Sequence, residues 1–118
     1  MTGMFEKNLQ ISYLLDFYGD ILPERKRAVM ESYYNGDLSL GEIADEMGVT
    51  RQAVRETVKK TEELLFFYEE KLGLLERFTE TRERVGRVAA LCEQMDSEDP
   101  AVKTLRAEIE ALSEVVSD

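Results

Sequence analysis

The sequence predicts an all-α protein, on the strength of three observations. Apolar residues recur at three- and four-residue spacings along most of the chain, and the apolar–polar alternation that is typical of strands is missing. Only two prolines interrupt the 118 residues, and the seven glycines are scattered singly. A hydrophobic share of 43% is enough for a real core, so we do not expect a disordered chain.

The first predicted helix follows residues 1–7, a lead-in without clear periodicity, and Asn8 is its expected N-cap. Its apolar residues are so dense that we expect burial on more than one side. They are Leu9, Ile11, Tyr13, Leu14, Leu15, Phe17 and Tyr18. Gly19 is expected to end this helix.

A second helix is predicted to begin at Pro23, because the missing N–H of proline costs nothing in a first helical turn. Its core-facing residues are expected to be apolar or aromatic, whereas its cations stay in water. The core set is Ala28, Val29, Met30 and Tyr33, and the solvated set is Arg25, Lys26 and Arg27. The turn residues Asn35-Gly36-Asp37 close the helix.

Residues 39–60, SLGEIADEMGVTRQAVRETVKK, predict a short helix, a tight turn and a second helix. Ser39 is a good N-cap with Glu42 as its capping-box partner. Gly48 can adopt the left-handed conformation that stops a helix at once. Val49 then fills the corner, and Thr50 caps the helix that begins at the next residue.

The second helix of this motif has an inner and an outer side. Val54 and Val58 face inward at four-residue spacing, which leaves polar and cationic side chains outside. The candidate DNA-contacting residues are Thr50, Arg51, Gln52, Arg55 and Lys59. This pattern is typical of a DNA-binding helix-turn-helix, whose second helix enters the major groove. A protein-docking or purely structural use of the same motif remains an alternative, because fold does not fix function.

The second helix is predicted to continue well beyond Lys60, to about residue 72–76. A heptad seam carries it, formed by Val54, Val58, Thr61, Leu65, Tyr68, Leu72 and Leu75. Residues 76–95 predict another amphipathic helix, residues 96–100 a turn, and the stripe from Val102 to Val116 a final helix. We therefore expect a helix-turn-helix domain at 1–75 and a C-terminal helical hairpin at 76–118.

The net charge of −10 argues against a protein that coats nucleic acid, since non-specific affinity comes from neutralising phosphates. The acidic residues are spread along the whole chain. Within the predicted recognition helix, however, cations outnumber acids, because Arg51, Arg55, Lys59 and Lys60 are accompanied only by Glu56. A local basic stripe on an acidic protein is compatible with binding to a specific duplex.

Several kinds of chemistry are not expected. The chain has no histidine, and its single cysteine, Cys92, excludes an internal disulfide and a zinc finger, so we expect no metal, no cofactor and no enzymatic activity. The aromatic groups Tyr33-Tyr34 and Phe66-Phe67-Tyr68 are interpreted as core rather than as base-stacking residues. Without a leader or a long apolar stretch, we expect no membrane insertion and a cytoplasmic location.

The chain resembles the YlxM-like family of small bacterial helix-turn-helix proteins, and residues 22–65 resemble the promoter-reading C-terminal domain of sigma factors. The resemblance is carried by residues 13–18 (YLLDFY), 38–46 (LSLGEIADE), 48–49 (GV), 51–54 (RQAV) and 68–72 (YEEKL). It implies an all-α fold with a sigma-like helix-turn-helix, and a regulatory role in the signal recognition particle pathway. Arg55 is a departure, because the resemblance implies an aromatic residue there.

Two functions follow as hypotheses. In the first, the protein is a non-enzymatic regulator that binds double-stranded DNA, in the setting of the signal recognition particle operon or pathway. In the second, it is an interaction module whose acidic surface binds or modulates the GTPase of that particle without binding DNA. The long seam and the hairpin stripes favour a homodimer, although the same stripes are also compatible with an intramolecular bundle.

Overall fold

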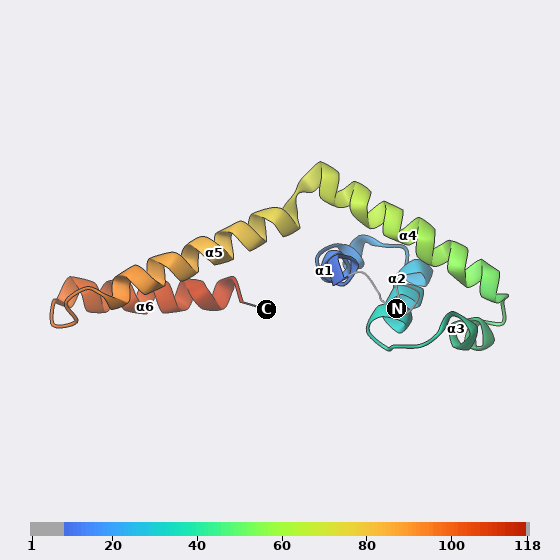
Figure 1. The fold of residues 1–118 in the computed structure, drawn as a ribbon, viewed down its shortest axis with the longest axis horizontal. Coiled ribbons are helices and arrows are strands. Elements are labelled where there is room, and N and C mark those ends of the chain that lie inside the picture. The colour runs from blue at the N-terminus through green and yellow to red at the C-terminus, as the bar shows by residue number, and fades with distance from the viewer. Residues whose placement is uncertain (1–8, 118) are drawn as a thin grey trace, which may run out of the picture. The chain divides into compact units, whose positions relative to one another are not determined.

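A computed structural model describes residues 9–117, which form six α-helices and one 3-10 turn (Figure 1). The elements are α1 (Leu9–Tyr18), η1 (Gly19–Ile21), α2 (Glu24–Tyr34), α3 (Leu40–Met47), α4 (Arg51–Leu72), α5 (Leu74–Glu93) and α6 (Pro100–Val115). Within the described range there is no strand, and the all-α prediction is confirmed. The predicted lead-in and the Asn8 cap lie outside the described residues.

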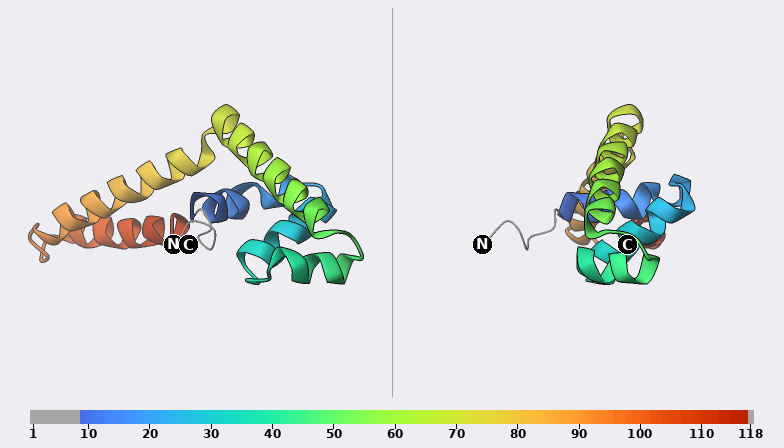
Figure 2. Two further views of the ribbon diagram at one scale, coloured as in Figure 1. Left: turned by 45° about the vertical axis from the view of Figure 1, so that its right-hand side comes forward. Right: turned by 90° about the vertical axis from the view of Figure 1, so that its right-hand side faces the viewer.

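The chain divides into two compact units, Met1–Leu75 and Glu76–Asp118, which we call the helix-turn-helix unit and the hairpin unit. In the first unit α1, α2 and α3 each contact α4 and gather on one side of it (Figures 1 and 2). In the second unit α5 and α6 run side by side in opposite directions (Figures 1 and 2). The long helix α4 is therefore the element on which the first unit is assembled.

The core of the helix-turn-helix unit forms around the inner stripe of α4. Val54, Val58, Thr61 and Leu65 of the predicted seam are all buried. They meet a set of buried side chains from the three shorter helices and the α1–α2 connection. That set is Ile11, Leu14, Leu15, Tyr18, Leu22, Val29, Met30, Ile43 and Ala44. The polar member, Thr61, is accommodated because its hydroxyl donates to the backbone carbonyl of Thr57 at 2.7 Å.

Several apolar residues expected in the core are exposed instead. Ala28 faces water, because α2 is turned so that Val29 and Met30 enter the core, and successive residues of a helix point in different directions. Leu9 and Tyr13 are exposed because, within residues 9–117, α1 packs mainly against α2 and α4, on its other side.

Further corrections concern the exposed apolar residues of α4 and the start of α2. Phe66 and Phe67, which were predicted to lie in the core, and Leu72 of the predicted seam are exposed on α4. Fewer side chains of α4 are therefore buried near its C-terminal end than near its start. Tyr68 is half-buried against the core. Pro23 lies just before α2 as its extended N-cap residue rather than within the first turn.

A buried tyrosine secures the C-terminal end of α4. Gly73 adopts a left-handed conformation (φ 62°) and ends the helix, and α5 begins at the next residue. The Tyr18 hydroxyl donates to Glu69 Oε1 at 2.6 Å and accepts the N–H of Leu74 at 3.1 Å. The same carboxylate oxygen accepts the N–H of Leu75 at 3.0 Å. Burial, followed by the hydrogen bond to Glu69, raises the pKa of Tyr18, so the hydroxyl keeps the proton that it donates.

The hairpin unit is held by few contacts. Cys92, Val102 and Ile109 form its small core with Ala89. Asp99 caps α6 by accepting the N–H of Ala101 at 2.9 Å. The Arg106 guanidinium donates to two carbonyls at the end of α5, those of Cys92 and Glu93, and to the carbonyl of Met95 just after it. A cation placed there complements the negative end of the helix dipole.

Replacing Tyr18 with phenylalanine tests the end of α4. The variant keeps the ring in the core but leaves the N–H of Leu74 without its acceptor and removes one donor from Glu69. We expect the free energy of unfolding, measured by urea denaturation, to fall by about 1–3 kcal/mol. Tyr13→Phe is the matched control at an exposed position and should change it by less than about 0.5 kcal/mol. Equal effects of the two substitutions would contradict the role assigned to Tyr18.

Candidate nucleic-acid interface

The corner between α3 and α4 is built as the sequence predicts. Ser39 and Glu42 form a complete capping box, with the Ser39 hydroxyl accepting the N–H of Glu42 at 3.1 Å and the Glu42 carboxylate accepting the N–H of Ser39 at 2.9 Å. These hydrogen bonds lower the pKa of Glu42. Gly48 is left-handed (φ 70°) and ends α3 at Met47. The N–H of Val49 then bonds to the Ala44 carbonyl at 3.1 Å, which closes the turn.

The predicted recognition helix starts directly after this corner. The Thr50 hydroxyl accepts the N–H of Ala53 at 3.0 Å and so caps α4. Arg51, Gln52, Arg55 and Lys59 are all exposed, whereas Val54 and Val58 are buried on the opposite side. Among residues 9–117, none of these four exposed side chains takes part in an ion pair or a hydrogen bond. The cations are therefore not neutralised by the carboxylates that surround them in the sequence.

All three cations of this set, Arg51, Arg55 and Lys59, line a groove of about 550 Å³ in the helix-turn-helix unit. Val58 of the same helix also lines it. The remaining lining residues are Tyr33 from α2, Leu40 from α3 and Glu62 from α4. Thr50 and Gln52 do not line the groove. The structure thus brings three of the five predicted site residues together beside an aromatic ring that sequence reasoning had assigned to the core.

The end of the groove at Glu62 differs from the rest in charge. The Tyr34 hydroxyl donates to the Glu62 carboxylate, and burial together with that hydrogen bond raises the pKa of Tyr34. Tyr33 packs edge-on against Tyr34, with ring centroids 5.1 Å apart. A carboxylate held in place at this end favours an anion near Arg51 and Arg55 rather than near Glu62.

Sequence reasoning missed Tyr33 and Leu40 because they belong to helices other than α4, whereas Glu62 lies on α4 itself, three residues after Lys59, where helical spacing alone is sufficient to place it. A helical periodicity assigns a residue to an inner or an outer side, but it does not show which residues of other helices lie nearby. Tyr33 is half-buried and serves both roles, since it packs against the core and lines the groove. The Tyr-Tyr pair was the available signal, and it was interpreted as core.

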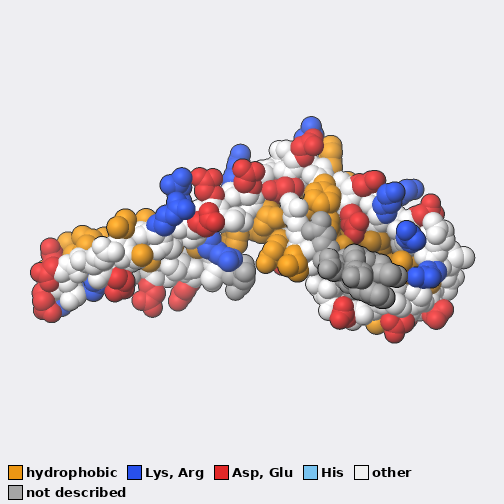
Figure 3. Space-filling view, viewed as in Figure 1, with side chains coloured by type: hydrophobic (Ala, Val, Ile, Leu, Met, Phe, Trp, Pro, Cys, Tyr) orange, Lys and Arg blue, Asp and Glu red, His pale blue; other side chains and the backbone are white. Residues whose placement is uncertain are grey.

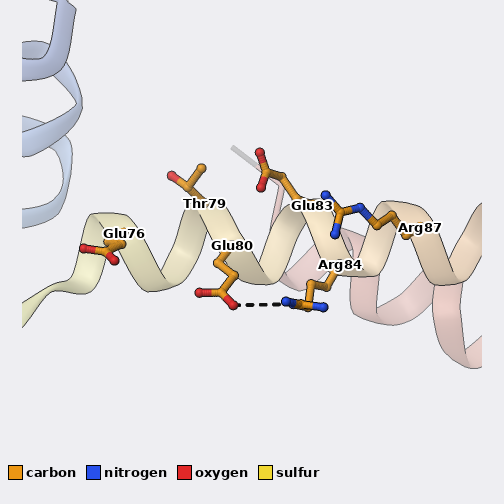
Figure 4. Close-up of a pocket in the computed structure, with 6 residues that line it drawn as sticks. All are labelled: Glu76, Thr79, Glu80, Glu83, Arg84 and Arg87. Atoms are coloured by element: carbon orange, nitrogen blue, oxygen red, sulfur yellow. Dashed lines mark hydrogen bonds and ion pairs between the residues drawn. The ribbon is translucent and has the colours of Figure 1, made fainter.

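A second hollow, on α5, is a less suitable binding site. Its lining residues are Glu76, Thr79, Glu80, Glu83, Arg84 and Arg87, all from one helix (Figure 4). Glu80 and Arg84 form an ion pair at 3.4 Å, which is the dashed line in Figure 4. An open helix surface with mixed charge offers no converging groups for a ligand. Among the described residues, no group of three or more acidic residues, cysteines or histidines is arranged to hold a metal ion.

The corner, the caps and the exposed second helix define the first unit as a helix-turn-helix, a fold class that many DNA-binding proteins use. The chain also matches, over residues 5–107, the family described as "Putative helix-turn-helix protein, YlxM / p13 like". It belongs to this family.

Similar proteins occur in several Bacillus species. UPF0122 proteins of Bacillus cereus (strain AH187), Bacillus anthracis (strain A0248) and Bacillus thuringiensis subsp. konkukian (strain 97-27) are each 42% identical to this chain over 109 residues. Each match covers 92% of this chain and 99% of the relative. In the described part of the chain, no helix has the length and apolar content to cross a membrane.

Gly48→Ala tests the corner between α3 and α4. A Cβ at this residue would meet no atom within 4 Å, so the cost comes from the left-handed backbone alone. We expect a loss of about 1–2 kcal/mol in the free energy of unfolding. The control is Gly86→Ala within α5, where space is also open and the backbone is helical, and it should stabilise by about 0.5–1 kcal/mol. A neutral Gly48→Ala would show that the corner does not need a left-handed residue.

Proposed function

We propose that this protein is a non-enzymatic regulator that binds double-stranded DNA through the N-terminal half of α4. The observation that carries the proposal is the row of exposed cations Arg51, Arg55 and Lys59, which has no ion-pair partner among residues 9–117. Membership of a helix-turn-helix family supports the same function.

The side chains suit distinct contacts with a duplex. Arg51 and Arg55 can each form paired hydrogen bonds with a guanine edge or with phosphate oxygens, and Gln52 can pair in the same way with adenine. Lys59 lies two turns from the start of the helix and suits a phosphate. The Thr50 hydroxyl accepts a backbone N–H, but its own proton remains available for a phosphate oxygen.

The wider setting that we propose is the signal recognition particle operon or pathway, in the cytoplasm. The support is the resemblance to the YlxM-like family, to which the chain belongs. In this proposal two copies associate, because a homodimer presents two recognition helices to one duplex and adds their phosphate contacts.

One observation favours a second function, docking to a protein. The end of α5 and the connection to α6 are acidic and exposed, with Glu93 as the last residue of α5, Asp96, Glu98 and Asp99 after it, and no cation between them in the sequence. Such a tip suits a basic partner, and the RNA-binding GTPase subunit of the signal recognition particle is the partner that this alternative proposes. Co-purification with that subunit, or a change in its GTPase rate, in the absence of any DNA binding would favour docking over the DNA function.

Alanine substitution of Arg55 tests the DNA-binding proposal. With duplexes selected from a random pool and with the upstream region of the protein's own operon, we expect Arg55→Ala to weaken binding by about 1–3 kcal/mol, measured by fluorescence anisotropy. Arg25→Ala on α2 is the control, because it makes the same change in net charge at an exposed residue away from the groove. The proposal fails if no duplex binds, or if both variants weaken binding equally.

The salt dependence of binding provides a separate test of the phosphate contacts. The slope of log K against log salt concentration should be negative, with a contribution of about −0.9 for each phosphate neutralised. Lys59→Ala should reduce the steepness of the slope by about one contact and weaken all duplexes alike. A slope that does not change in this variant would remove Lys59 from the interface.

A further inference from the structure

The hairpin unit leaves a large part of its apolar surface in contact with water. Its buried residues are few and small, and they include Cys92, Val102 and Ile109. Six larger side chains remain at least 40% exposed. These are Val88, Leu91 and Met95 from α5, and Leu105, Leu112 and Val115 from α6. Hydrophobic side chains are visible at the surface of this unit in Figure 3.

These exposed residues belong to one side of the hairpin. A largely apolar groove of about 240 Å³ runs between the helices and is lined by Thr81, Arg84, Val85 and Val88 of α5 and by Ile109 and Leu112 of α6. Leu91 and Met95 follow Val88 by three and seven residues, and Leu105 precedes Leu112 by seven. Residues at these spacings share a helix face, so the groove is the centre of one continuous apolar face.

A unit of this size does not stabilise itself easily. The hairpin unit, Glu76–Asp118, is close to the length of about 40 residues below which domains usually need a disulfide, a metal or a partner. Its single cysteine rules out an internal disulfide. Covering the apolar face with another protein surface would supply the core that two helices alone lack.

Two charged side chains on either side of the groove indicate which surface covers this face. Arg84 lines the groove on the α5 side and directly precedes Val85. Glu108 directly precedes Ile109 and lies three and four residues from Leu105 and Leu112, which places it on the α6 edge of the same face. Because Val85 and Ile109 line one groove, the cation and the carboxylate flank the face at about the same level.

We propose that this face docks on the same face of a second copy, forming an antiparallel four-helix bundle. The two copies are related by a two-fold axis that runs parallel to the helices of the hairpin. Helix α5 of each copy then packs against helix α6 of the other. That operation brings Arg84 of each copy to Glu108 of the other, so the face is complementary to itself in charge as well as in apolar character. The inference rests on the homodimer of the proposed function, but it does not depend on the DNA contacts.

The existing ion pair of Arg84 does not prevent this contact. Arg84 Nε donates to Glu80 of its own helix at 3.4 Å (Figure 4). The pair is exposed and therefore contributes little. A guanidinium carries five N–H donors, so the remaining N–H groups can bind a carboxylate of the second copy while Nε keeps Glu80.

The first arm of the test measures the mass of the full chain by sedimentation equilibrium. The wild type should sediment at twice 13.6 kDa, and Leu112→Glu should shift it to 13.6 kDa while the circular dichroism spectrum stays helical. Ala111→Glu is the control, because it adds the same charge at the neighbouring exposed residue, outside the groove. A monomeric wild type, or equal effects of the two variants, would overturn the proposal.

The second arm uses charge reversal, which leaves the apolar core intact. Arg84→Glu and Glu108→Arg should each raise the dimer dissociation constant by about tenfold or more, because like charges then meet at both edges. Mixing these two single variants should restore the affinity of the wild type, since each contact in the mixed dimer again joins opposite charges. Failure of the mixture to recover would overturn the proposed pairing.

The two arms separate this inference from the DNA proposal. Arg51→Ala should weaken DNA binding and leave the sedimentation mass of the dimer unchanged. If the dimer forms as described and no duplex binds, the DNA function fails while the hairpin assignment stands. If the wild type binds DNA as a monomer, the hairpin assignment fails alone.

Discussion

The helix-turn-helix unit depends on the burial of one stripe along α4. Val54, Val58, Thr61 and Leu65 supply that stripe, and the three shorter helices pack against it because burying apolar surface is favourable. Once this side of the helix is buried, the opposite side must face water. The exposure of Arg51, Arg55 and Lys59 is therefore a consequence of core packing as much as of their own polarity.

Specific backbone and side-chain interactions fix both ends of α4, and they differ between the two ends. At its start, a left-handed glycine and the Thr50 side chain set the first turn. At its end, another left-handed glycine is joined by the buried hydroxyl of Tyr18, which reaches from α1 to the start of α5. Fixed ends hold the register of α4 against the core. If that register shifted by one residue, a different side of the helix would face the core and other side chains would face solvent.

The two units differ in how far they satisfy their own apolar surface. In the helix-turn-helix unit, four helices enclose a continuous core. It includes aromatic contacts such as that between Tyr18 and Tyr68, whose ring centroids are 5.7 Å apart. In the hairpin unit, two helices bury a handful of small side chains and leave leucines and a methionine exposed. This contrast is why the hairpin is interpreted as a surface for association and the first unit as a surface for recognition. The DNA-binding proposal gives a binding partner to the unpaired cations of α4. The dimer proposal covers the apolar side chains that the hairpin unit leaves exposed to water.

The sequence by itself determined the helices, their caps and the inner and outer sides of α4, because these depend on interactions between residues a few positions apart. The capping box at Ser39, the corner at Gly48, the cap at Thr50 and the end of α4 near Leu72 were all predictable for that reason. Tertiary structure alone decided which apolar residues remain exposed, such as Phe67 and Ala28, and which side chains surround the cations. The placement of Tyr33 beside Arg51 and the hydrogen bonds of Tyr18 join residues that are far apart in the chain, and no local pattern encodes which helices become neighbours.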